Sequence, residues 1–121
     1  MTFPTIKFIH TNTEPNYELQ ILITDKLRTL NKYLTHAKDV QIEVELEKLN
    51  NHTKGNIYRL EVNLWRSGTL FRSAVMHENF SKAIDAVRAE LDKELGRFHD
   101  RRVSMFKKGA RMIKQIMKRE I

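Results

Sequence analysis

Apolar and polar residues alternate along two segments in the middle of the chain. In residues 40–47 every second residue is Val, Ile or Leu, and the residues between them are Gln or Glu. Residues 58–64 repeat the alternation with Tyr, Leu and Val. A period of two over this length predicts a β-strand with one buried and one exposed face. We expect both segments in an antiparallel sheet, joined by a loop at residues 49–56.

Two further strands are predicted at the ends of this region. Residues 5–9, TIKFI, are short and rich in β-branched and aromatic residues. Residues 69–76 follow the dipeptide Ser67-Gly68, which is a plausible tight hairpin turn. The sequence therefore predicts a sheet of four strands.

Two other segments carry apolar residues at helical spacing, three or four residues apart. The first helix follows Pro15, a helix-entry residue, and its stripe is Ile23, Leu27, Leu30 and Leu34. The second helix begins after a cap at Asn79 or Ser81, and its stripe is Phe80, Ile84, Val87, Leu91, Leu95 and Phe98. Amphipathic helices of this kind cover the apolar face of a sheet.

The order of predicted elements is β-α-β-β-β-α. The fold class is α+β, a two-layer sandwich in which both helices pack on one face of the four-stranded sheet. We place this domain at residues 1–102 and a basic amphipathic extension at residues 103–121. The apolar stripe of the extension is Phe106, Ala110, Ile113 and Met117. Two states are open for it: a helix broken or hinged near Gly109, or a segment that is disordered until it meets a partner.

The distribution of charge along the chain indicates the kind of partner that the protein binds. The chain has 121 residues and a net charge of +7. Residues 1–96 hold 13 basic and 13 acidic residues, whereas residues 97–121 hold 9 basic and 2 acidic residues. Such an asymmetry indicates a polyanionic partner, nucleic acid first and an anionic membrane second. The alternative is a basic tail that serves only solubility.

The residues that enzymes and metal sites need are sparse. There is no Cys, the five His residues form no metal-binding pair, and no glycine-rich phosphate loop is present. His77-Glu78 is interpreted as a turn or capping element, and Glu43, Glu45 and Glu47 as a solvated strand face. We expect no enzyme activity, no cofactor and no small-molecule substrate. Without an apolar span or a signal peptide, we expect a cytoplasmic protein and no membrane partner.

The helices carry the candidate binding site. The outward strand positions are mostly acidic, at Gln41, Glu43, Glu45, Glu47, Arg59, Glu61 and Asn63, and we expect that face to repel phosphate. The candidate RNA-binding residues lie instead on the outer side of the two helices: Lys26, Arg28, Lys32, Lys82, Lys93, Arg97, Arg101 and Arg102. The alternative is a salt-bridged solvent face, because the second helix also contains Asp85, Glu90 and Glu94.

Several segments together resemble a known family. These are DVQIEVELEK at residues 39–48, HTKG at 52–55, YRLEVNL at 58–64, SGTL at 67–70, and His77-Glu78 before KAID at 82–85, with spaced Leu and basic positions beyond. In order and spacing they resemble the ribosome hibernation-promoting factors, also called ribosome-associated translation inhibitors or sigma-54 modulation proteins. The resemblance covers about residues 3–102.

The resemblance implies the β-α-β-β-β-α fold, similar to double-stranded RNA-binding domains, and no catalysis. It implies binding to rRNA in the small-subunit cleft where tRNA and mRNA sit, through Lys26, Lys32, Lys93, Arg97 and Arg101. Thr29 departs from the family, which has a basic residue there. Because the chain ends at residue 121, we expect a short form without a dimerisation domain, monomeric off the ribosome. The alternatives are a module for other structured RNA, or a protein-interaction or membrane-surface protein.

Overall fold

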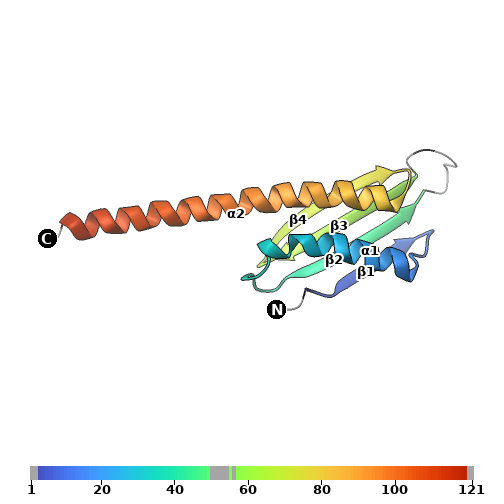
Figure 1. The fold of residues 1–121 in the computed structure, drawn as a ribbon, viewed down its shortest axis with the longest axis horizontal. Coiled ribbons are helices and arrows are strands. Elements are labelled where there is room, and N and C mark those ends of the chain that lie inside the picture. Colours follow the sequence, from blue (N-terminus) through green and yellow to red (C-terminus); the bar gives the residue numbers. More distant parts are fainter. Residues whose placement is uncertain (1–2, 50–54, 56, 120–121) are drawn as a thin grey trace.

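Four strands form one sheet in the computed structural model, which describes residues 3–49, 55 and 57–119. They are β1 (Ile6–Thr11), β2 (Gln41–Lys48), β3 (Tyr58–Arg66) and β4 (Thr69–His77), and they lie side by side in that order (Figure 1). Each predicted strand is present, within two residues of its expected ends. Most of the predicted loop at residues 49–56 lies outside the described residues.

The sheet is mixed, and our expectation of an antiparallel sheet is wrong for its first pair. β1 and β2 are parallel, with Ile6 opposite Ile42, whereas β2, β3 and β4 pair antiparallel. The direction follows from the connection, because a helix separates β1 from β2 and carries the chain back across the sheet before β2 begins. Alternation within a strand contains no information on the direction of its neighbour.

The predicted hairpin turn at Ser67-Gly68 joins β3 to β4. Both residues have positive φ, 49° for Ser67 and 85° for Gly68, as a two-residue turn matched to the twist of the strands requires. Ser67 is held in this conformation by the loop before β2, since its amide donates to the carbonyl of Lys38 at 2.8 Å and its hydroxyl is 3.0 Å from that carbonyl. The hairpin therefore fixes the position of the end of β3, where Arg66 is the last residue.

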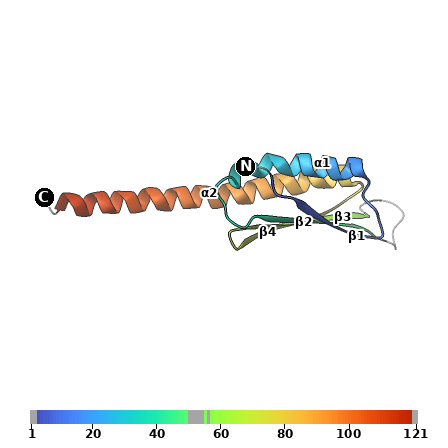
Figure 2. The ribbon, with the colours of Figure 1, turned by 90° about the horizontal axis from the view of Figure 1, so that it is seen from below.

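Both helices lie on one face of the sheet, as predicted (Figure 2). Helix α1 (Tyr17–Arg28) passes into a short 3-10 helix, η1 (Thr29–Tyr33), and helix α2 (Phe80–Arg119) follows β4. The side chains of Asn16 and Asn79 cap α1 and α2 by accepting backbone amides at 2.8 Å, so Asn79 and not Ser81 is the cap of α2.

The core lies between the helices and the sheet. The predicted stripes are buried: Ile23, Leu27, Leu30 and Leu34 from α1 and η1, and Phe80, Ile84, Val87, Leu91 and Leu95 from α2, with Phe98 partly buried at the end. From the sheet, Ile42, Val44 and Leu46 point toward the helices. Glu43 and Glu45 therefore face away from the helices, so the predicted strand register is confirmed.

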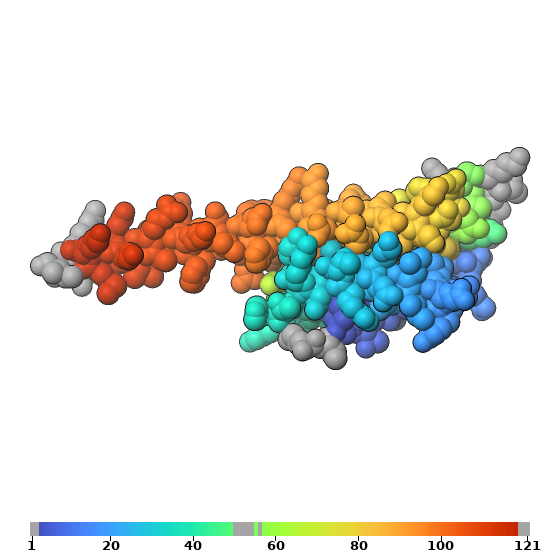
Figure 3. Space-filling model, viewed as in Figure 1, coloured from blue at the N-terminus to red at the C-terminus, as the bar shows by residue number. Residues whose placement is uncertain are grey.

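Helix α2 continues far beyond the sheet. Its first half packs beside α1, and its second half projects with no element alongside it (Figures 1 and 3). We call residues 103–119 the tail. The tail is helical, as one of our two predictions had it, but the expected break near Gly109 is wrong. A helix already nucleated by its packed first half extends at little further cost, which explains why the tail is helical without a partner.

Candidate nucleic-acid interface

The helices carry all eight candidate cations, and Arg102 differs from the others because it lies beside Phe98 and Arg66 at the end of the sheet. Residues Lys26, Arg28 and Lys32 come from α1 and η1, and the other five come from α2. Since α1 and α2 lie side by side (Figure 3), residues far apart in sequence share one surface. The structure divides them into three groups, which differ in whether a carboxylate is within reach.

The first group lies in the seam between the two helices. The ammonium of Lys26 is 2.9 Å from a carboxylate oxygen of Asp85, and that of Lys32 is 3.5 Å from Asp92. All four side chains are more than one third exposed, so each pair stabilises the fold by only about 0–1 kcal/mol. A phosphate group competes easily with ion pairs this weak, and both lysines stay candidates for RNA contacts.

The second group forms a row on α2. Lys93, Arg97 and Arg101 follow one another at intervals of four residues, which places them along one side of the helix. All three side chains are exposed, and among the described residues no carboxylate lies within 4.0 Å of any of them. We call these three residues the α2 row. The exposed small residues Ala86 and Ala89 lie near its N-terminal end and leave room for a bulky ligand.

The acidic residues of α2 do not neutralise this row. Asp85 and Asp92 are turned toward α1 by the seam pairs, and Glu90 accepts a hydrogen bond from the hydroxyl of Ser73 on β4. Of the acids that we expected to form a salt-bridged face, only Glu94 has no such partner among the described residues. Side-chain pairing therefore turns Asp85, Asp92 and Glu90 away from the row, whereas Glu94 and Asp100 stay exposed on the same helix.

The remaining candidates are scattered. Lys82 pairs with Glu78 one turn earlier, and this hydrogen bond and charge lower the pKa of the Glu78 carboxyl. Arg28 is exposed at the end of α1, and Arg102 lies beside Phe98 with its guanidinium carbon 5.7 Å from the ring centre. His77 accepts the amide of Glu78, consistent with the predicted turn element.

The open face of the sheet is less acidic than predicted. Glu61 was expected to be an exposed acid on this face, yet it is only 5% exposed and contacts both Arg59 and Arg72. Burial raises the pKa of the Glu61 carboxyl, but the hydrogen bonds and charges of the two arginines together lower it by more. The pKa of Glu61 is therefore below its ordinary value. The unneutralised acids are thus confined to β2.

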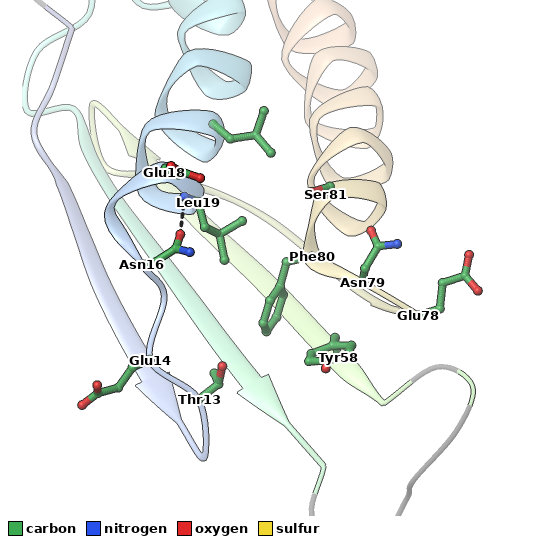
Figure 4. Close-up of a pocket in the computed structure, with 11 residues that line it drawn as sticks. Thr13, Glu14, Asn16, Glu18, Leu19, Tyr58, Glu78, Asn79, Phe80 and Ser81 are labelled. Atoms are coloured by element: carbon green, nitrogen blue, oxygen red, sulfur yellow. Dashed lines mark hydrogen bonds between the residues drawn. The ribbon is translucent and has the colours of Figure 1, made fainter.

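A shallow pocket lies where α1 and α2 begin. The two cap residues, Asn16 and Asn79, line it together with Leu19, Tyr58 and Phe80 (Figure 4). Figure 4 shows the Asn16 side chain directed at the backbone of Leu19, with Glu14 and Glu78 pointing away from the pocket. The two asparagines of the pocket are thus used for capping. Among the described residues, no cluster of three His, Asp or Glu could hold a metal ion.

Sequence reasoning missed one cation next to the predicted site. Arg66, at the end of β3, donates from Nε to the carbonyl of Tyr33 at 2.9 Å and lies close to Arg102 of α2. The two arginines are 36 positions apart, and no pattern in the sequence relates them. Only the packing of α2 across the end of β3 brings them together.

Comparison with known proteins identifies the family of the chain. A model of the family described as sigma 54 modulation protein / S30EA ribosomal protein matches residues 6–103. The chain belongs to this family. The resemblance that we inferred from sequence is therefore confirmed, and the family is one of non-enzymatic, ribosome-associated proteins.

Two solved structures share the fold of this family member. The Thermus thermophilus Protein Y N-terminal domain is 23% identical, with a TM-score of 0.65, and the match covers 76% of this chain and 94% of that one. A ribosomal subunit interface protein from Coxiella burnetii is 13% identical, with a TM-score of 0.63, covering 78% and 97%. A search of curated proteins gave no match.

The family match includes the α2 row and the seam but almost none of the tail. Helix α2 crosses the end of the match at Val103 without interruption. Within the described ranges, every helix is too short or too polar to span a bilayer. The tail beyond Val103 thus lies outside the residues that the family model matches.

Proposed function

We propose that this protein binds the small ribosomal subunit in the cleft between head and body, where tRNA and mRNA otherwise sit. Occupancy of that cleft inhibits translation and stabilises idle ribosomes, which is the hibernation state of cytoplasmic ribosomes in a stress response. The observation that carries the proposal is the α2 row: exposed cations that have no carboxylate partner among the described residues, on a domain whose family is ribosome-associated.

The contacts are electrostatic and go mainly to rRNA phosphates. The α2 row and Arg28 contribute charge that has no carboxylate partner among the residues the structure describes, and Lys26, Lys32, Lys82 and Arg102 contribute charge that is paired weakly or stacked on a ring. Each phosphate contact adds about 0.7–0.9 to the slope of log affinity against log salt. Binding to ribosomes should therefore weaken steeply as salt rises.

Sedimentation of the protein with ribosomes tests the proposal. We expect co-migration with small subunits and whole ribosomes at low salt, and its loss in the double variant Lys93→Glu/Arg97→Glu, which stays folded because both side chains are exposed. The matched control is Lys7→Glu/Lys48→Glu, which makes the same change in net charge at exposed positions off the α2 row and should bind as the wild type does. Unchanged binding of the first variant, or co-migration only with lighter RNA, contradicts the proposal.

A further inference from the structure

A cavity of about 410 Å³ lies where α2 passes the end of the sheet and becomes the tail. It is lined by Tyr33 of η1, Arg66 of β3, and Leu95, Phe98, His99, Arg102, Val103, Phe106 and Lys107 of α2. Its volume lies within the range of small-molecule sites, about 300–1,000 Å³. Its residues come from three separate elements, so the fold assembles it.

Aromatic rings make up much of the lining. Phe98 is held in place by an edge-on contact with Phe71 of the core, with ring centres 5.3 Å apart. The rings of Tyr33 and His99 are 6.3 Å apart beside it. Phe106 is 78% exposed, which is an unusual place for so large an apolar ring. Ring faces that are fixed or exposed in this way are the surfaces on which nucleobases stack.

Positive charge accompanies the rings. The guanidinium carbons of Arg66 and Arg102 lie 5.6 and 5.7 Å from the centre of the same Phe98 ring. Among the described residues neither guanidinium has a carboxylate within 4.0 Å. Burial lowers the pKa of Arg66, and the charge of Arg102 lowers it further. Two cations are therefore held beside one ring and the carbonyl of Tyr33, with no carboxylate among the described residues to neutralise them, and a bound anion would offset their repulsion.

We propose that this cavity is a nucleotide-binding site. The phosphate is held by Arg66 and Arg102, with Lys107 at the mouth, and the base stacks on the exposed ring of Phe106. A purely apolar ligand would strip water from two guanidiniums that have no carboxylate partner among the described residues, which is unfavourable. An inorganic anion alone would leave the exposed ring unused. A nucleotide combines the two chemistries that the lining offers.

The nucleotide is either an unstacked residue of an RNA strand or a free mononucleotide. The first source deepens the proposed function and rests on it, because it would give the protein a contact to a single-stranded base beside its phosphate contacts. The second would be a regulatory ligand. Both use the same phosphate and ring contacts.

Titration of the full-length protein tests the site. The probes are adenosine 5′-monophosphate, uridine 5′-monophosphate, inorganic phosphate and a short single-stranded RNA. Binding of each probe is measured by calorimetry and by the changes in the amide chemical shifts of Phe98 and His99. We expect nucleotides to bind more tightly than phosphate. Phe106→Ala should weaken them by about tenfold, the size of one lost stacking contact. Met105→Ala is the matched control, since this neighbour is 73% exposed and does not line the cavity.

A second variant and a second assay separate this inference from the proposed function. Arg66→Gln should weaken the binding of nucleotides and of inorganic phosphate alike, because both lose a phosphate contact, whereas Lys93→Glu/Arg97→Glu should lose ribosome binding and keep mononucleotide binding. Tighter binding of the RNA than of the mononucleotides supports the RNA strand as the source, and the reverse supports a free nucleotide. The inference is overturned by no binding of any nucleotide, by phosphate binding as tightly as nucleotides, or by equal affinities of the Phe106 and Met105 variants.

Discussion

Glu61 shows how a single carboxylate can be buried on the open face of a sheet. Arg59, two residues away on β3, and Arg72, on β4, both contact its Oε1 atom, and the amide of Asn63 reaches its other oxygen at 3.4 Å. A buried carboxylate without partners would be protonated or costly, because burial disfavours the charged form. Here the arginines keep it ionised, and it ties two neighbouring strands together.

We predict that Glu61→Gln destabilises the fold at neutral pH by about 1–3 kcal/mol, because the amide leaves two arginines without their counter-charge. The pKa of Glu61 is lowered in the folded state from its ordinary value near 4.5, so its contribution is fully present above that value and is lost as the pH falls from there through the lower pKa of the folded state. Denaturant unfolding from about pH 6 to 3 should show a shallower loss of stability in the variant than in the wild type. Parallel curves for the two proteins would contradict this role.

At the scale of elements, the tail is the least expected part of the molecule. Its large apolar residues beyond Val103, among them Phe106, Ile113 and Met117, are more than half exposed, yet α2 runs through them without a break. Gly109 is the weakest point of this segment, since glycine in a helix interior costs about 1 kcal/mol relative to alanine. A methyl group there would meet nothing within 4 Å.

We therefore predict that Gly109→Ala strengthens the tail helix by up to about 1 kcal/mol. Helical circular dichroism should rise, and amide hydrogen exchange around residue 109 should slow. Gly96→Ala is the contrasting change in the same helix, because its new methyl would lie 3.3 Å from the hydroxyl oxygen of Tyr33 and so gain less. No change in exchange at residue 109 would indicate that the tail is not helical in solution.

The elements could be predicted from sequence because their signals are local. The stripe from Ile23 to Leu34 and the alternation in β2 each lie within one stretch of chain, and both gave the correct buried face. The errors concern relations between distant residues. The parallel pairing of β1 with β2, the burial of Glu61 by Arg72 and the approach of Arg66 to Arg102 all depend on how separate elements pack. The end of α1 at Arg28 could not be predicted either, because the 3-10 helix that follows keeps Leu30 and Leu34 buried and so continues the apolar stripe.

At the scale of the whole molecule, the excess positive charge lies mostly in the part of the chain that projects from the compact domain. Residues 1–96 carry no net charge, and the excess of basic residues begins at Arg97 and continues along the tail. The tail cations with described side chains, Lys107, Lys108, Arg111, Lys114 and Lys118, are all exposed; Glu120 lies outside the described residues. The tail is thus suited to add phosphate contacts beyond those of the domain.

We predict that truncation after Arg102 leaves a folded monomer that binds ribosomes more weakly, with a shallower dependence on salt, because tail cations no longer release counterions. Sedimentation with ribosomes at several salt concentrations measures both effects. A full-length variant with Gln at residues 107, 108, 111, 114 and 118 separates charge from helix and should resemble the truncated protein. Equal binding before and after truncation, or a full-length dimer that truncation dissolves, would contradict this role of the tail.

The length of α2 also affects how the protein moves through a liquid. Its 40 residues extend about 60 Å at 1.5 Å per residue, and the tail stands clear of the rest of the chain. A rod attached to a compact body has more friction than a sphere of the same mass. On a gel-filtration column the monomer should therefore elute early, at the position of a heavier globular protein. Light scattering measures molar mass independently of hydrodynamic size, and it should still give the 14.4 kDa of a single chain.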